Sequence, residues 1–220
     1  MVAVSRWLRP HVPEASDGIL TSAGIVEGFA GAGVSQGVLA FAGLAGLIAG
    51  TFAMGSVEYS KFRAEHDLQV AQIEAERAQL AAAPDAELDE LAALYVSRGL
   101  SPGLARQVAV ELTARDALAA HAEAELGITE ATRATPLRDA AGAGASFAGG
   151  AVLPWLAIVV IPGEYRAWVT FAVVLAALAL TGWATARMSL VPPAVPVLRT
   201  AAIGALSMLI TYVAGHFFYP

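Results

Sequence analysis

Long apolar runs separated by polar segments are the main pattern of this 220-residue chain. A helix needs about 20 mainly apolar residues to cross the roughly 30 Å hydrocarbon core of a bilayer. Five stretches approach this length, and they are residues 18–34, 38–57, 140–161, 167–186 and 200–218. The first stretch is rich in glycine and contains Glu27, and the third contains Pro154. The pattern predicts an all-α membrane protein with five transmembrane helices.

The polar segment between the second and third runs also has a helical pattern. Residues 60–83 contain neither Gly nor Pro, so we expect the second span to continue as one long helix that Pro84 ends. A second helix is expected over 85–98, ended by the glycine that follows it. Ser101 is a candidate N-cap for a further helix, or helix pair, that ends at Gly127. The sequence thus predicts a helical subdomain inserted between two membrane spans.

The positions of Lys and Arg predict the orientation, because basic loops stay on the cytoplasmic side. Of the basic residues, only Arg166 falls outside the N-terminal tail, the long polar segment and the connection between the last two spans. The N-terminus and the polar segment are therefore expected in the cytoplasm, and the C-terminus outside. The expected domains are a cytoplasmic tail (1–16), two transmembrane helices (17–60), a cytoplasmic helical domain (61–139) and three further transmembrane helices (140–220).

Composition and charge agree with a membrane protein that handles cations. Hydrophobic residues make up 57% of the chain, and charged residues only 15%. Residues 64–139 nevertheless carry 14 acids against six basic residues. This local negative charge argues against a nucleic-acid partner. The absence of cysteine excludes disulfides and thiolate metal sites.

Three pairs of polar side chains in the acidic segment have spacings of three or four residues, which place each pair on one helical face. The pairs are Glu76 with Gln79, Glu87 with Glu90, and His121 with Glu125. Carboxylates with an occasional imidazole are the ligands by which helical bundles bind Fe(II) or Mn(II). The competing interpretation is a solvated acidic surface.

Other function classes fit less well. The sequence contains no P-loop or Ser/His/Asp arrangement, and a ferritin-like oxidase would need two Glu-x-x-His pairs, so we expect no enzyme. The alternative to transport is a membrane-anchored scaffold or metal-sensing protein whose acidic cytoplasmic helices bind a partner. Glu27 argues against a simple anchor, because an ionised carboxylate at the bilayer centre costs roughly 2.5–3.5 kcal/mol. We expect it to line a pore or to be protonated, and not to face lipid.

Three segments resemble one known family. They are "SDGILTSAGIVEG" at 16–28, "AGLAGLIAGTFAMGSVEYSKFRAEHD" at 42–67 and "AHAEAELGI" at 120–128. In content, order and separation they are similar to the vacuolar iron transporter family. The resemblance implies transport of Fe²⁺, and often Mn²⁺, out of the cytoplasm in exchange for protons. It also implies a homodimer in a lipid bilayer, with a pore between the subunits and no tightly bound cofactor.

The resemblance further suggests individual residues for metal binding in the cytoplasmic domain. Glu76, Glu87, Glu90 and Glu125 match the family's ligands. His121 stands where a plant relative has a methionine, and Gln79 stands where the plant pattern has a glutamate. Zn²⁺ is a further candidate ion. The short N-terminus suggests the plasma membrane of a prokaryote, with a vacuolar membrane as the alternative.

In the membrane, Asp17 and Met54 match the translocation residues of the family. The plant pattern has a glutamate where this chain has Gly46, and either Glu27 or Glu58 is a candidate to replace it. Each assignment has a structural alternative. Asp17 would cap a helix N-terminus, Met54 would fill the core, and Glu58 would form an ion pair with a neighbouring lysine.

Overall fold

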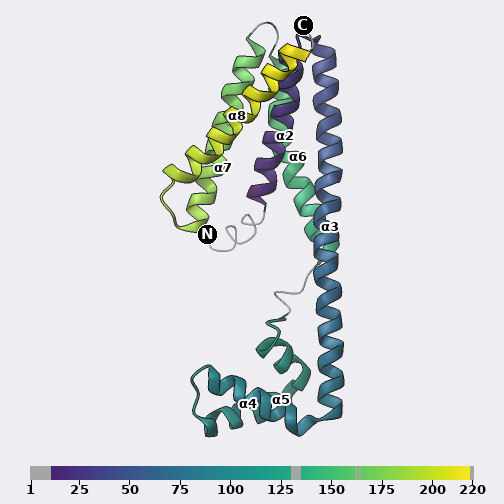
Figure 1. Cartoon of the computed structure of the whole chain (residues 1–220), viewed down its shortest axis with the longest axis vertical. Coiled ribbons are helices and arrows are strands. Elements are labelled where there is room, and N and C mark those ends of the chain that lie inside the picture. Colours follow the sequence, from purple (N-terminus) through teal and green to yellow (C-terminus); the bar gives the residue numbers. More distant parts are fainter. Residues whose placement is uncertain (1–10, 130–134, 162, 164, 219–220) are drawn as a thin grey trace. The chain divides into compact units, whose positions relative to one another are not determined.

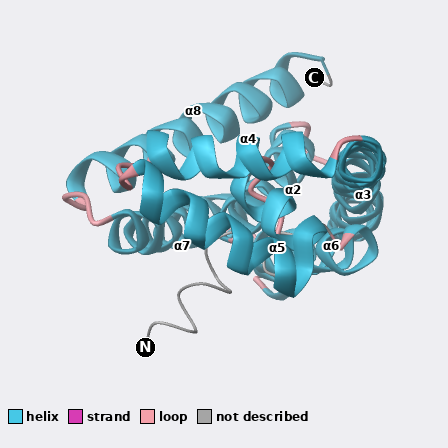
Figure 2. Ribbon diagram, turned by 90° about the horizontal axis from the view of Figure 1, so that it is seen from below, coloured by secondary structure: helices cyan, strands magenta, loops and turns pink. Residues whose placement is uncertain are grey.

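The computed structural model describes residues 11–129, 135–161, 163 and 165–218. In these residues every regular element is an α-helix, and loops join them (Figure 2). The helices are α2 (Val12–Gly31), α3 (Gln36–Ala82), α4 (Pro84–Ser97), α5 (Pro102–Ala124), α6 (Pro136–Val160), α7 (Arg166–Ser189) and α8 (Ala194–Phe218). The predicted all-α fold is confirmed.

Four of these helices, α3, α6, α7 and α8, are long and apolar enough to cross a membrane. They include the predicted second to fifth spans. Helix α2 is not among them, because its 20 residues include the acids Glu14, Asp17 and Glu27. The chain is thus a multi-pass membrane protein, and the use of α2 as a fifth span stays a prediction.

The N-terminal tail is shorter than the sequence suggested. We expected residues 1–16 to precede the first helix, but α2 already begins at Val12, with Pro13 in its first turn. Proline suits this position, because the first turn of a helix has no use for its missing N–H. Residues 1–10 of the expected tail lie outside the described part of the chain.

The chain divides into two compact units, residues 1–59 with 137–220 (unit 1) and residues 60–136 (unit 2). Helix α3 runs without a break through the boundary, as predicted. In unit 1, α2 packs against both α7 and α8, which also pack against each other (Figure 1). A core cluster holds these three helices together, and its buried members are Ile19, Ala23, Val174, Leu178 and Met208.

Glycines allow α2 and α8 to approach closely. A Cβ added to Gly31 would overlap with the backbone oxygen of Tyr212, and one added to Gly215 would overlap with that of Gly28. The two helices therefore meet backbone to backbone, as small residues permit between membrane helices.

Two glycine pairs, Gly24 with Gly28 and Gly46 with Gly50, have the four-residue spacing by which small residues serve either a dimer contact or packing within one subunit. Gly24 and Gly28 pack against Thr211 of α8. The other pair belongs to α3, and there Gly46 lies against Ile25 and Gly50 against Phe147, again within the chain. These glycines therefore have a packing role inside one subunit, and they no longer support a dimer.

The turns of unit 2 follow the sequence signals. Helix α3 ends at Ala82, and Pro84 opens α4. Gly99 has a φ of +101°, and the N–H of Leu100 donates to the carbonyl of Tyr95 at 3.1 Å, which is the pattern of a Schellman motif. Ser101 stands at the N-cap of α5 but makes no capping hydrogen bond through its side chain, so its expected capping role is wrong.

Candidate metal site

Four side chains in unit 2 converge on one point. Glu76 comes from α3, Glu87 from the first turn of α4, His121 from the last turn of α5, and Glu125 caps the C-terminus of α5. Each offers one oxygen or nitrogen atom, and these four atoms lie within 4.8 Å of one another. His121 is fully buried, and Glu76 is only 4% exposed.

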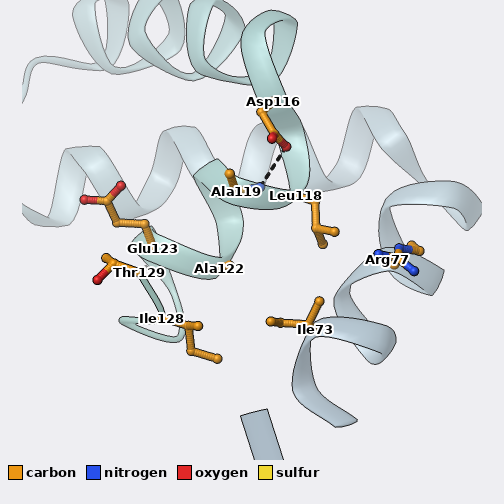
Figure 3. Close-up of a pocket in the computed structure, with 9 residues that line it drawn as sticks. All are labelled: Ile73, Arg77, Asp116, Leu118, Ala119, Ala122, Glu123, Ile128 and Thr129. Atoms are coloured by element: carbon orange, nitrogen blue, oxygen red, sulfur yellow. Dashed lines mark hydrogen bonds between the residues drawn. The ribbon is translucent and has the colours of Figure 1, made fainter. Parts of the chain in front are cut away.

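A break in α5 sets the direction of the segment that carries the histidine. Asp116 has extended backbone angles inside α5, and its Oδ1 accepts a hydrogen bond of 3.0 Å from the N–H of Ala119 (Figure 3). Asp116 therefore acts as an N-cap in the middle of the element. A helix pair was one of the two predictions for this segment, but Asp116 was not predicted as the break. The signal is present, because an Asp before "ALAA" is a typical N-cap.

Packing between α4 and α5 supports the site. Leu91, Ala109 and Ala124 form the buried core of this unit. Arg98, directly after α4, donates a hydrogen bond to the carbonyl of Ala124, beside Glu125. The sequence does not reveal this contact, because a single arginine gives no sign of its distant partner.

The imidazole of His121 lies at the centre of the carboxylates. Its Nδ1 is 2.6 Å from Oε1 of Glu125, 3.0 Å from Oε1 of Glu76 and 3.9 Å from Oε2 of Glu87. The Nδ1 atom carries at most one hydrogen, so it can satisfy one carboxylate well, and that partner is Glu125. The arrangement thus gathers more negative charge than one histidine can neutralise.

This crowding changes the acidity of Glu76. Burial raises the pKa of its carboxyl, and the nearby charge of Glu125 raises the pKa further. His121 opposes the shift, while Glu87 and Glu90 add to it. A divalent cation would relieve both the burial cost and the repulsion.

The donor set fits a borderline divalent ion. Donor atoms on opposite sides of one ion, each about 2.1 Å from it, are about 4.2 Å apart, so the four atoms need to close by only about half an ångström. Carboxylate oxygens suit Mn(II), and imidazole suits Fe(II) and Zn(II). Three carboxylates with one imidazole therefore make a suitable binding site for such metals.

Two predicted ligands lie outside this group. Gln79 and Glu90 are exposed, whereas their partners Glu76 and Glu87 are buried. Residues three apart on an α-helix point about 60° away from each other. On α3 and α4 this offset carries the second residue of each pair to the surface, so the pairs do not aim both members at the centre. Glu90 still acts on Glu76 through its charge.

A separate hollow of about 350 Å³ opens elsewhere on unit 2 (Figure 3). It is lined by Ile73, Arg77, Asp116, Leu118, Ala119, Ala122, Glu123, Ile128 and Thr129. None of the four clustered ligands lines this hollow, and Arg77 on its wall is paired with Glu74 at 2.9 Å. It contributes no ligand to the metal site.

The candidate residues of the membrane unit lie in different environments. Asp17 is exposed and stands in the second turn of α2, so the helix-cap alternative for this residue is wrong. Met54 and Glu58 are half-buried on α3, one turn apart. The side chain of Asp17 is thus accessible from outside the single subunit.

Glu27 is only 2% exposed and is covered by its own chain, so it does not face lipid. It stands one turn from Ala23, which packs with α7 and α8, and one turn from Gly31, which touches α8. Gly46, where the plant pattern has an acid, faces Ile25 instead. Residues two apart on a helix point about 160° away from each other, so Glu27 lies on the other side of α2 from Gly46.

Three relatives illustrate what the chain is similar to. A protein of Acanthamoeba castellanii named vacuolar iron transporter is 42% identical over 130 residues, which are 59% of this chain and 47% of that relative. Vacuolar iron transporter 1 of Tulipa gesneriana is 27% identical over 200 residues, covering 90% of this chain and 81% of the relative. Vacuolar iron transporter 2 of Oryza sativa subsp. japonica is 28% identical over 195 residues, covering 87% and 79%.

These relatives are named as transporters, which agrees with the expectation that the chain is not an enzyme. The resemblance seen in the three sequence segments is confirmed by a family model that extends far beyond them. Because this model matches residues 8–216, nearly the whole chain, the protein belongs to the VIT family, a family of transporters.

Proposed function

We propose that the protein transports Fe²⁺, Mn²⁺ or both out of the cytoplasm in exchange for protons and so protects the cell from excess metal. The relatives' names support iron as a substrate. The proposal mainly rests on the group of Glu76, Glu87, His121 and Glu125, of which the first three are buried and Glu125 is half-buried. A solvated acidic surface would have no reason to bury two carboxylates and hold a third, half-buried one around a single imidazole.

In this proposal unit 2 is the cytoplasmic domain that collects the ion. The four ligands replace part of the ion's hydration shell, and the carboxylates must be deprotonated to do so. The ion is cargo, and binding must remain weak enough for it to leave. Zn²⁺ would compete, because the same donors suit it.

The path through the membrane is proposed to use Asp17, Met54 and Glu58. Asp17 is exposed in the single chain, which leaves it accessible to a second copy. We therefore propose a homodimer with the pore between subunits, α2 as the fifth span and the N-terminus in the cytoplasm. The plasma membrane of a prokaryote is the proposed location.

The test is ion flux in proteoliposomes that contain the whole chain, with Mn²⁺ or Fe²⁺ on one side and with or without a pH gradient. We expect flux of at least one metal, faster when protons can move in the opposite direction. The double variant Glu87→Gln with Glu125→Gln should weaken Mn²⁺ binding at least about 10-fold. Loss of an outer-shell partner that only orients a metal ligand typically lowers metal affinity by this factor, and loss of a ligand itself should cost no less. Glu111→Gln, which removes an exposed acid of α5, is the matched control.

Two outcomes would contradict the proposal. Binding of Mn²⁺ without any flux would favour the metal-sensing alternative. Absence of both binding and flux would leave the membrane-anchored scaffold, with acidic helices that bind a partner protein.

A further inference from the structure

Two buried polar side chains in unit 1, one on α2 and one on α7, have no part in the proposed metal path. Glu27 of α2 is 2% exposed, and Thr170 of α7 is fully buried. Neither Oε1 of Glu27 nor Oγ1 of Thr170 has a hydrogen-bond partner among the described residues. A buried polar atom without a partner costs free energy, so such atoms point to a ligand or to water.

The two helices run antiparallel and bring these side chains to one level. Towards the middle of both helices, Ala23 of α2 and Val174 of α7 are members of the same buried core cluster. At a second contact, the guanidinium of Arg166, at the start of α7, donates a 3.1 Å hydrogen bond to the carbonyl of Val34, just beyond α2. The buried glutamate and threonine lie between these two contacts on their respective helices.

A hollow of about 380 Å³ opens at this end of unit 1. It is lined by Ala30, Gly163, Arg166, Ala167 and Tyr212. Ala30 stands three residues from Glu27 on α2, and Ala167 stands three residues from Thr170 on α7. Glu27 and Thr170 do not line the hollow themselves, and each stands about one helical turn along its helix from a residue that does.

The charges around this hollow disfavour a metal ion. In the described parts of the helices packed against this half of α2, the charged or titratable groups are Arg166 of α7 with Tyr212 and His216 of α8. The fixed positive charge of Arg166 repels a divalent cation twice as strongly as it repels a singly charged hydronium ion at the same distance. One carboxylate and one hydroxyl also offer far fewer donors than the cluster in unit 2. A single proton needs only one acceptor.

We propose that the hollow, Thr170 and Glu27 form a proton entry route inside each subunit, separate from the metal path. In the loading step a hydronium ion in the hollow gives its proton to a carboxylate oxygen of Glu27, which leaves a neutral acid and a water molecule. The hydroxyl of Thr170 can accept one hydrogen bond and donate another, so it can relay the proton. Arg166 disfavours divalent metal ions at this entrance more strongly than it disfavours hydronium. The inference rests on the proton exchange proposed above.

The experiment measures two fluxes in the same proteoliposomes, Mn²⁺ entry and the proton movement that accompanies it, with a pH-sensitive dye in the lumen. Glu27→Gln should lower Mn²⁺-driven proton movement at least about 10-fold and keep at least about half of the Mn²⁺ flux down its own gradient. Thr170→Val should slow proton movement, and Thr170→Ser should restore it. Thr21→Val, at an exposed position of α2, should behave as the wild type.

Other outcomes would overturn the inference. Equal loss of both fluxes in a Glu27→Gln protein of unchanged melting temperature would make Glu27 part of the metal path. Full proton movement in that variant would place the route elsewhere. If Glu27→Gln does not fold, unchanged proton movement in Thr170→Val overturns the route. Metal flux without protons in the wild type would refute the inference and leave metal transport standing. Absence of both Mn²⁺ and Fe²⁺ flux would refute the proposed function itself.

Discussion

Units 1 and 2 both bury a glutamate, but they surround it differently. Glu76 in unit 2 is 4% exposed and lies among two further carboxylates and an imidazole. Glu27 in unit 1 is 2% exposed, and its Oε1 has no hydrogen-bond partner in the described structure. The number of neighbouring donors, and not the depth of burial, separates a site suited to a divalent ion from one suited to a proton.

The same comparison explains how each unit tolerates its acid. In unit 2 a cation can offset the repulsion that gathers around Glu76. In unit 1 the carboxyl can take up a proton and become neutral, which removes most of the cost of burial. The predictions that follow test this contrast, beginning with the change of largest expected effect.

Asp17→Asn should abolish metal flux to the level of empty liposomes. Asp17 is exposed in the single chain, so the substitution removes a charge from the proposed path without disturbing a packed core. Flux is measured with Mn²⁺, and the melting temperature checks the fold. Flux at the wild-type rate would show that Asp17 is not part of the metal path.

Mn²⁺ should stabilise unit 2, because an ion that binds only the folded state adds about 2.7 kcal/mol at 100 times its Kd. The melting temperature of detergent-solubilised protein should rise with Mn²⁺. The rise should disappear in Glu87→Gln with Glu125→Gln. The rise in melting temperature should remain in Glu27→Gln. Its loss in that variant would show that Glu27 of unit 1 also takes part in Mn²⁺ binding.

Gly31→Ala should destabilise unit 1 by about 1–3 kcal/mol, which is typical of overpacking. The added Cβ would overlap with the backbone oxygen of Tyr212, and backbone can give way only if a helix moves. Gly37→Ala is the matched control, because a Cβ added there would meet nothing within 4 Å. Calorimetry should find Mn²⁺ binding by unit 2 unchanged in both variants. Weaker binding in Gly31→Ala alone would show that the units are not independent.

The stability of the metal-free protein should depend on pH through Glu76. Its pKa is raised in the folded state above the ordinary value of 4.5, so the stabilising contribution is complete below about pH 4.5. The contribution is lost as the pH rises through the folded-state pKa. Glu76→Gln should flatten this fall in chemical denaturation with a chelator present. A fall of equal size in the variant would assign it to other groups.

Glu90→Gln should have the smallest effect, a decrease of a few-fold at most in Mn²⁺ affinity. Glu90 is exposed and influences Glu76 only through its charge. Isothermal titration calorimetry measures the change. A loss as large as that of the Glu87 and Glu125 substitutions would restore Glu90 as a ligand and show that the cluster rearranges around the ion.

The sequence predicted the helices well because their signals are local. Apolar length predicted the long helices, Pro84 and Gly99 marked their turns, and the resemblance named all four clustered ligands. Spacing alone could not exclude Gln79 and Glu90, because a shared helical side does not decide which residue is buried. The predicted start of α2 was also wrong, because the polar residues before Gly18 are typical of a tail and not of a membrane helix.

By itself the sequence determined the all-helical membrane fold, the acidic character of unit 2 and its candidate ligands. Only the tertiary structure decided which acids meet, since Glu76 and Glu125 are 49 residues apart and are joined by the kink at Asp116 and the packing of α4 on α5. It likewise decided that Glu27 and Gly46 lie on different sides of α2. Periodicity fixes how residues are arranged around one helix, whereas the contacts between helices decide what each side faces.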